Sequence, residues 1–314
     1  MNRTLQIALN IVVGVVAFIF FLVLVFPLDA VVGHYLANLE SLTKGHYRLV
    51  IGEMDASLLF DSEFLDFKLE QKQGENFVEI VEIPKLKVGI SLMALLSRSA
   101  NLHFNAEFKK GEVRGQLVYS PAETMLDLKF DKMALEQLSL VQGMLRGQGF
   151  GAELRGTLDG MLAFTQVQRG GLMGSDAQFN LKLSDFRLED IKINVSGQSF
   201  FLPVLVLSPK EGQALIEGEL GEGRLSLTNL SLPGPDFELQ VSGRLNLNNN
   251  FQIARSALTG RFAFSEALLS KVPMLAMISL ERKADGYYPF RLAGSSDKPQ
   301  IRIGNLNISE MLGL

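Results

Sequence analysis

The sequence predicts a mainly β protein, in which an N-terminal single transmembrane helix is followed by a large antiparallel, curved β-sheet domain with a few short helices. Two observations predict this class. The chain begins with one long apolar run, and from Tyr47 onward apolar and polar residues alternate with a period of two. Short Gly, Asn, Asp and Ser breaks join the alternating segments, and these breaks suit hairpins but are too short for parallel crossovers.

The first element is the apolar run from Leu5 to Phe26, which contains no charged residue. At about 1.5 Å of rise per residue it is roughly 33 Å long, enough to cross a hydrocarbon core of about 30 Å. A cleaved signal peptide is the rival interpretation, but its apolar region is normally shorter and ends at a small-x-small site. We therefore expect residues 1–27 to be a cytoplasmic stub and membrane anchor. The anchor residues are Leu5, Ile7, Leu9, Ile11, Val15, Phe18, Phe21, Leu24 and Phe26.

Charges on either side of the anchor predict its orientation. Arg3 precedes the apolar run, whereas Asp29 and Glu40 follow it and Lys44 is the first cation after it. The positive-inside bias keeps the amino end in the cytoplasm and sends the rest of the chain across the membrane.

The next segment, residues 28–43, has the apolar spacing of one helical stripe. The stripe consists of Val31, Val32, Tyr35, Leu36, Leu39 and Leu42, and Gly45 is placed to end the helix. Because the segment lacks the basic face of a lipid-surface helix, we expect it to pack against the sheet.

The strands that follow each have one apolar and one polar face. Two segments show this best, and their apolar residues are the candidate face of a groove or core: Phe179, Leu181, Leu183, Phe237, Leu239, Val241, Leu245 and Leu247. The alternation changes phase between Leu227 and Leu230 and again after Ile303, which predicts bulges or strand ends.

A few short helices are expected among the strands. One begins with Asp131 as its cap and continues to Gly147, a second covers Ser91–Ser97, and a third covers Ser265–Val272 before Pro273. The glycine-rich region 143–174 is the best candidate for a boundary. We therefore expect a membrane-proximal part at 28–146 and a distal β-rich part at 147–314, with one continuous domain over 28–314 as the alternative.

Composition narrows the classes of function. The chain has 30 basic and 34 acidic residues, a net charge of -4 and no dense basic cluster beyond Lys109 and Lys110, so nucleic acid is not an expected partner. It has no cysteine, which excludes disulfides, thiolate metal sites and cysteine nucleophiles.

Catalytic and metal-binding motifs are missing from the sequence. The histidines His34, His46 and His103 have no carboxylate at ligand spacing, and no serine-hydrolase, zinc-protease or nucleotide-loop pattern occurs. Gly147, Gly149 and Ala152 match a loose dinucleotide fingerprint, but a strand is expected after them where binding requires a helix. We expect no enzyme activity, no cofactor and no metal.

The apolar faces of the strands need a partner. A second sheet would cover them in a closed sandwich. The alternative is a long curved sheet whose apolar face stays open as a groove for acyl chains or for a partner protein.

Several segments resemble the AsmA-like proteins of the Gram-negative envelope. The first is the anchor, the expected helix and Gly45, followed by the stretch from Tyr47 to Phe60. The second is Ile83-Pro84-Lys85-Leu86-Lys87-Val88, which precedes the expected small helix. The third is Tyr288 to Gly294, followed by Asp297 to Ile301. Length and layout are most similar to the type II secretion system protein N family. The resemblance implies a single-pass bacterial inner-membrane protein whose β-rich domain is periplasmic. It offers no catalytic residues.

Two functions follow as expectations. The first is a non-enzymatic component of the type II protein secretion system that contacts other secretion-system envelope proteins and contributes to protein export. The alternative is an AsmA-like envelope protein that binds or transfers lipid acyl chains in an apolar β-groove.

Overall fold

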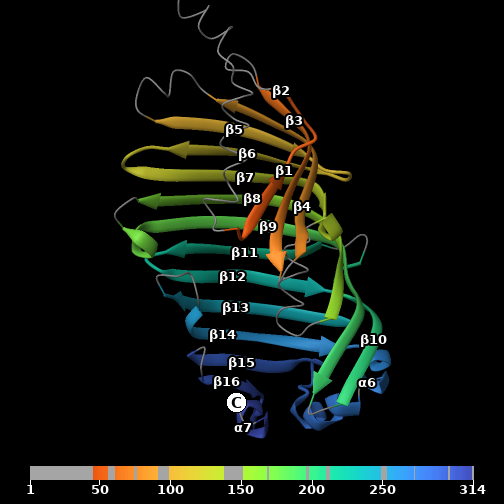
Figure 1. Ribbon diagram of the computed structural model, residues 1–314. Helices are drawn as coiled ribbons and strands as arrows, with labels where there is room; N and C mark the ends of the chain where they lie inside the picture. Colours follow the sequence, from red (N-terminus) through yellow and green to blue (C-terminus); the bar gives the residue numbers. More distant parts are fainter. Residues whose placement is uncertain are drawn as a thin grey trace, which may run out of the picture.

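The computed structural model describes residues 45–55, 61–73, 76–90, 99–137, 151–167, 170–195, 198–209, 213–248, 253–271, 273–295 and 298–312. The described chain forms one sheet of 17 strands, with few helices (Figure 1). The first nine strands are β1 (Tyr47–Val50), β2 (Glu53–Asp55), β3 (Ser62–Gln73), β4 (Asn76–Ile90), β5 (Ala100–Glu107), β6 (Glu112–Tyr119), β7 (Glu123–Ala134), β8 (Gly151–Val167) and β9 (Ser175–Val195). The others are β10 (Gln198–Val206), β11 (Gln213–Gly221), β12 (Arg224–Pro233), β13 (Phe237–Leu247), β14 (Ile253–Phe264), β15 (Tyr288–Ser295), β16 (Lys298–Ile303) and β17 (Leu306–Asn307).

The sheet is an antiparallel meander. Each strand from β3 to β9 pairs with the next, β9 pairs with β11, and the order continues to β17. Consecutive pairing follows from the short turns, because a turn of a few residues can only return the chain beside the strand it left. The prediction of a mainly β chain with a large antiparallel sheet and few helices is confirmed. Of the two alternatives for covering its apolar faces, the described strands form an open sheet and not the two stacked sheets of a closed sandwich.

Two arms leave the main sheet where long strands bend (Figure 1). The central arm consists of residues 151–155 of β8, residues 187–195 of β9, and β10. At its base the register shifts between Arg155 and Thr157, and Asp185 has a positive φ of 50°. The N-terminal arm of β1, β3 and β4 begins near Asp66, whose φ is 51°. Such bulges bend and twist a strand, which turns each arm out of the plane.

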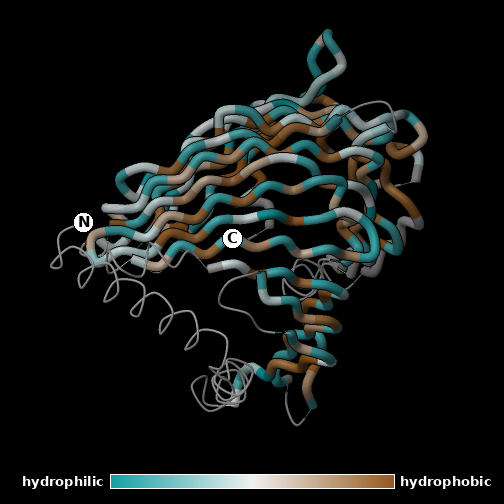
Figure 2. The backbone as a smooth tube through the Cα atoms, turned by 90° about the horizontal axis from the view of Figure 1, so that it is seen from above, coloured by the Kyte–Doolittle hydropathy of each residue, from teal (hydrophilic) through white to brown (hydrophobic). Residues whose placement is uncertain are grey.

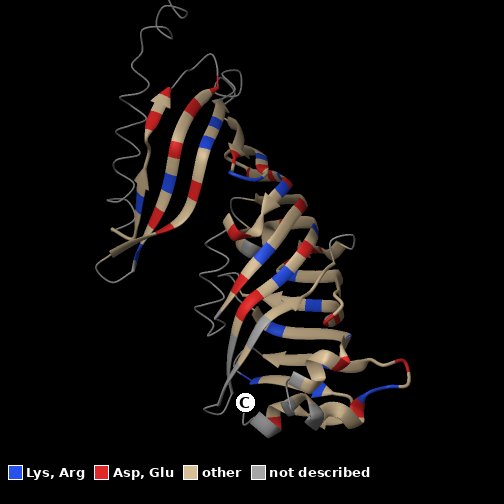
Figure 3. Ribbon diagram, turned by 90° about the vertical axis from the view of Figure 1, so that its right-hand side faces the viewer, with Lys and Arg blue, Asp and Glu red and all other residues tan. Residues whose placement is uncertain are grey.

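Hydrophobic and hydrophilic residues alternate along most strands (Figure 2). On the arms, Lys and Arg lie beside Asp and Glu (Figure 3). Lys109 Nζ lies 2.6 Å from Glu82 Oε2, and Lys68 Nζ lies 3.1 Å from Glu82 Oε1. The hydrogen bond from Lys109 is the largest cause that lowers the pKa of Glu82, and the hydrogen bond from Lys68 is the next. The hydrogen bond to Glu82 in turn raises the pKa of Lys68.

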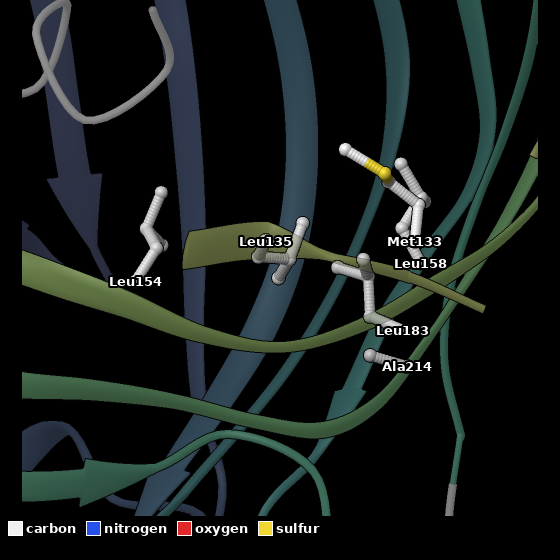
Figure 4. Close-up of a cluster of buried hydrophobic side chains, with 6 residues drawn as sticks. All are labelled: Met133, Leu135, Leu154, Leu158, Leu183 and Ala214. Carbon is white, nitrogen blue, oxygen red and sulfur yellow. The ribbon is translucent and has the colours of Figure 1, made fainter. Parts of the chain in front are cut away.

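The best-packed cluster lies where the central arm joins the sheet. Met133, Leu135, Leu154, Leu158, Leu183 and Ala214 are all buried there, and Figure 4 shows the side chains of Met133, Leu158 and Leu183 close together. Leu135 is in the 3-10 helix η1 (Leu135–Gln137), and residues 151–155 supply Leu154. The arm is therefore fixed to the sheet by apolar packing as well as by hydrogen bonds.

Helices cover the apolar face at the C-terminal end of the sheet. These are α6 (Glu266–Lys271), the 3-10 helix η3 (Pro273–Glu281) and, after β17, α7 (Ile308–Leu312). Ile278 of η3 packs on Phe262 and Tyr288, and Leu268 of α6 packs on Ile191 of the central arm. The helices thus join the end of the sheet to the arm.

Several sequence-based expectations can be compared with these elements. The phase change at Leu227 and Leu230 is a register shift, and Ile303 ends β16, as predicted. The expected helix at 265–272 is confirmed as α6, where Ser265 Oγ accepts a hydrogen bond from the amide of Leu268. The predicted start of the helix at Asp131 is wrong, because Asp131 pairs with Glu112 inside β7. The 3-10 helix η1 follows β7, and the rest of the expected helix, from residue 138 on, lies outside the described residues.

Some expectations fall outside the described residues. These are the anchor 5–26, the helix at 28–43 and the helix at Ser91–Ser97. Among the described residues no helix is long and apolar enough to span a membrane. The expected boundary at 146/147 also lies outside them, and β7 and β8, which precede and follow it, are hydrogen-bonded neighbours.

Candidate functional site

The candidate site is the apolar face of the main sheet. Residues that pair directly across successive strands point to the same side, so the register defines rows of side chains. One row crosses 12 strands and consists of Val88, Phe104, Gly115, Leu128, Leu162, Phe179, Gly218, Leu227, Gly243, Leu258, Leu292 and Ile301. All its members are apolar or glycine.

A second, parallel row has the same character. It consists of Leu86, Ala106, Val113, Phe130, Gly160, Leu181, Ile216, Leu230, Val241, Gly260, Phe290 and Ile303. With strands about 4.8 Å apart, each row is about 50 Å long. Together these two rows are called the apolar face below.

Phenylalanine rings lie over glycines on this face. Phe179 Cζ would lie 2.5 Å from a Cβ at Gly218, and Phe290 Cε1 would lie 2.7 Å from one at Gly260. The ring of Phe104 covers Gly115 in the same way. Rings that fold onto neighbouring glycines cover the backbone with apolar surface. Because the rings lie against the backbone of the neighbouring strand, the apolar surface is continuous across the strands.

The eight residues predicted as the groove or core face lie on β9 and β13. Phe179, Leu181 and Val241 belong to the apolar face, and Leu183 is buried in the cluster around Met133. The other four are also on β13: Phe237 and Leu239 pack in the cluster around Ile278, Leu245 pairs with Leu225, and Leu247 pairs with Ile253 beyond a register shift. The structure thus divides the predicted set between packed core and partly exposed surface.

The first row of the apolar face is partly exposed in its middle section. Phe104, Leu128, Leu162, Phe179 and Leu227 are partly exposed. Val241 is 9% exposed and Phe262, beneath η3, is also 9% exposed. In the second row, Val113, Phe130, Leu181 and Ile216 pack against the cluster around Met133. Among the described residues, the first row on strands β5 to β12 is therefore the part of the face that can receive a ligand.

The polar face has some ionisable groups, but they do not form a catalytic arrangement. A hollow of about 680 Å³ at the hairpin ends of β8–β9 and β11–β12 is lined by Asp176, Glu219, Glu222, Arg224 and Arg244, among others. His103 Nε2 lies 3.0 Å from Asp61 Oδ1. In the described part of the chain no group of three His, Asp or Glu side chains could hold a metal.

Tyr287 and Glu238 form a hydrogen-bonded pair at the end of β13. The bond from the Tyr287 hydroxyl to Glu238 raises the pKa of Tyr287, and partial burial adds to the rise. The guanidinium of Arg261 stacks 4.3 Å from the centre of the same ring. These contacts fix the loop before β15 against the sheet.

One feature of the polar face is not visible in the linear sequence. Strands β13 to β16 carry six exposed cations, of which Arg261 is paired with Asp285. The other five gather on the same face, although they are spread over almost sixty residues of chain: Arg244, Arg255, Arg291, Lys298 and Arg302. The sequence has no basic run in this region, so a search for clusters in one dimension misses them. The signal that could have found them is the scarcity of acidic residues between 239 and 303 at alternate, solvent-facing positions.

No family model, curated protein or solved structure matches this chain. Its function is therefore inferred from the geometry and chemistry of the sheet.

Proposed function

We propose that this chain is a non-enzymatic envelope protein that binds the acyl chain of a lipid along the apolar face. The observation that carries the proposal is the pair of uninterrupted apolar rows that cross the sheet. A large accessible apolar surface on a folded protein is generally an interaction site.

The chemistry of the face favours a ligand without polar groups. Its side chains offer no hydrogen-bond donor or acceptor, and the backbone groups between its strands are paired within the sheet. A polypeptide segment would bring amide groups that lose water without gaining a partner, which is costly. An acyl chain has no such groups.

The dimensions and energy are also suitable. The hydrocarbon core of a bilayer is two acyl chains thick and measures about 30 Å, so a row of about 50 Å exceeds one chain. Each methylene that leaves water contributes about 0.8 kcal/mol. Ten methylenes fully removed from water would contribute about 8 kcal/mol, and contact with one open face gives roughly half of this before the cost of ordering the chain.

Two neighbouring residues on opposite faces of β8 give a direct test. Leu162 lies on the apolar face, whereas Met161 is 61% exposed on the polar face. The full-length chain would be extracted with its lipids and analysed by native mass spectrometry. We expect Leu162→Asp to lower the co-purified lipid strongly and Met161→Asp to leave it unchanged. Wild-type protein without lipid would contradict the proposal.

A second candidate function is a component of the type II secretion apparatus, anchored once in the inner membrane with its β-rich part in the periplasm. The observation that favours it is β10, whose described pairing partner is β9 and which exposes Phe201 by 58% and Val204 by 46%. An edge strand with exposed apolar residues suits contact with a protein partner. If the second candidate function holds, Phe201→Glu should reduce co-purification with secretion subunits and lower protein export. The control is Met173→Glu, which changes another exposed residue and should alter neither.

A further inference from the structure

The strands at the C-terminal end of the sheet present a strongly basic polar face. Arg291 on β15 pairs directly with Arg302 on β16. Arg255 on β14 pairs with Ser295, which in turn pairs with Lys298, and Arg244 on β13 pairs with Ala257. The register puts all five cations on one side of four adjacent strands. We call these five residues the arginine surface.

Among the described residues these cations have no ion-pair partner, although Arg244 lines the same hollow as Glu219 and Glu222. No ion pair within 4.0 Å joins any of them to a carboxylate of the described residues, whereas Lys68, Lys85 and Lys109 elsewhere on the sheet all have acidic partners. Strands β13 to β16 contain one acidic residue, Glu238, and it accepts a hydrogen bond from Tyr287.

The pairing of Arg291 with Arg302 is unfavourable for the fold itself. Like charges that face each other across two strands destabilise a sheet. A sequence that breaks a local rule without a compensating contact often does so at a functional site. A bound anion between Arg291 and Arg302 would offset the repulsion between their charges.

We propose that the arginine surface docks on the phosphate groups of an anionic phospholipid membrane. Guanidinium groups bind phosphate oxygens in a two-pronged geometry, and basic side chains near an anionic membrane each contribute to attraction. The surface is roughly 15 Å across in both directions. It lies on regular strands, so it can contact several headgroups at once.

The distribution of charge favours a membrane over other polyanions. No polar-face position of β13 to β16 is aromatic, so the surface lacks the platforms on which single-stranded nucleic acid stacks its bases. The chain as a whole carries a net charge of -4, so an anionic membrane is attracted to this basic surface and not to the protein as a whole. The sheet therefore approaches the membrane with its C-terminal strands.

The surface is also held rigidly from behind. On the opposite side of the same strands, Phe262, Ile278 and Tyr288 form a buried cluster, and the rings of Phe262 and Tyr288 stack 5.3 Å apart. A rigid support fixes the strands that carry the guanidinium groups, so the entropic cost of binding is limited to the ordering of the side chains. This site is separate from the apolar face, which lies on the other side of the sheet.

The test uses the full-length chain in nanodiscs of neutral phosphatidylcholine and measures the capture of added vesicles. We expect capture of vesicles that contain phosphatidylglycerol, loss of capture in high salt, and no capture of pure phosphatidylcholine vesicles. Arg291→Glu with Arg302→Glu should lower capture at least about tenfold. The control is Lys129→Glu with Lys182→Glu, an equal charge change at exposed polar-face positions of β7 and β9, which should leave capture within about twofold.

Arg291→Glu alone covers the case in which the double variant fails to fold. It places opposite charges across the β15–β16 pair, so it should lower capture while the protein remains folded. Leu162→Asp should leave capture unchanged, which separates this proposal from acyl-chain binding.

Three results would overturn the inference. The first is equal capture by the charge-reversed protein and the wild type. The second is binding of inorganic phosphate alone that abolishes capture, since this would indicate a site for the free ion. The third is that the arginine substitutions weaken the binding of duplex DNA but leave vesicle capture unchanged.

Discussion

The ring of Phe104 on β5 lies across Gly115 of the neighbouring β6, in the position that a side chain at residue 115 would occupy. The same relationship joins Phe179 to Gly218 and Phe290 to Gly260. These three pairs cover the apolar face with flat rings from β5 to β15. The pairing of aromatic with glycine explains how a sheet with several glycines can still have a continuous apolar surface.

Gly115→Ala should destabilise the protein by about 1–3 kcal/mol, because its Cβ would overlap the Phe104 ring and the side chain of Leu128. Thermal or denaturant unfolding measures the change. Gly221→Ala is the matched control, since its Cβ would meet only the flexible carboxylate of Asp176 at 3.3 Å. Equal stability of the two variants would show that the ring does not need the glycine.

Met133→Ala should destabilise the protein by about 2–5 kcal/mol, because Met133 is fully buried where the central arm joins the sheet. Met161→Ala removes the same side chain from an exposed position and should change stability by less than about 0.5 kcal/mol. Denaturant unfolding measures both. A small loss for Met133→Ala would mean that the arm is not fixed by this cluster.

The sequence predicted the sheet well because period-two alternation depends on which side of a strand faces water, and this pattern is local. Phe179, Leu181 and Val241 could therefore be placed on one face without the structure. The alternation of Leu126, Leu128 and Phe130 is broken before Met133 by a register shift, where Lys132 has a positive φ of 48°. Because Asp131 is also a residue type that often caps helices, the sequence predicts that β7 ends too early.

Long-range features could not be predicted in this way. The two arms depend on the positive φ of Asp66 and Asp185, which no composition signal marks. The arginine surface depends on the register between β13, β14, β15 and β16, which brings together residues as far apart as 244 and 302. The arms and the arginine surface both depend on which strands pair and in which register. This cannot be predicted from the sequence of any single segment.

Arg291→Glu should stabilise the protein by about 0.2–1 kcal/mol, because it replaces a like-charge pair with Arg302 by an opposite-charge pair. Thermal unfolding at low salt measures the gain, which should shrink as salt is added. Arg255→Glu is the control, since Arg255 faces Asn246 and Ser295 and gains no such partner. A loss of stability in Arg291→Glu would contradict the cost assigned to the arginine pair.

Glu82→Gln should destabilise the protein by up to about 1 kcal/mol at neutral pH and by much less in acid. Lys109 and Lys68 lower the pKa of Glu82 in the folded state. A carboxyl of this kind adds stability above its unfolded-state pKa, and the contribution is lost as the pH falls through the folded-state pKa. Unfolding of both proteins across this acid range checks the sign, and a difference that grows in acid would refute it.

The most direct measurement of the central claim is photocrosslinking in cells from residues on the two faces of β8. A photoreactive amino acid at Leu162 should form adducts with lipid, and the same group at Met161 should not. Lipid adducts at position 162 alone would agree with acyl-chain binding on the apolar face. Protein adducts at position 162 without lipid would contradict it and favour a secretion partner on that face.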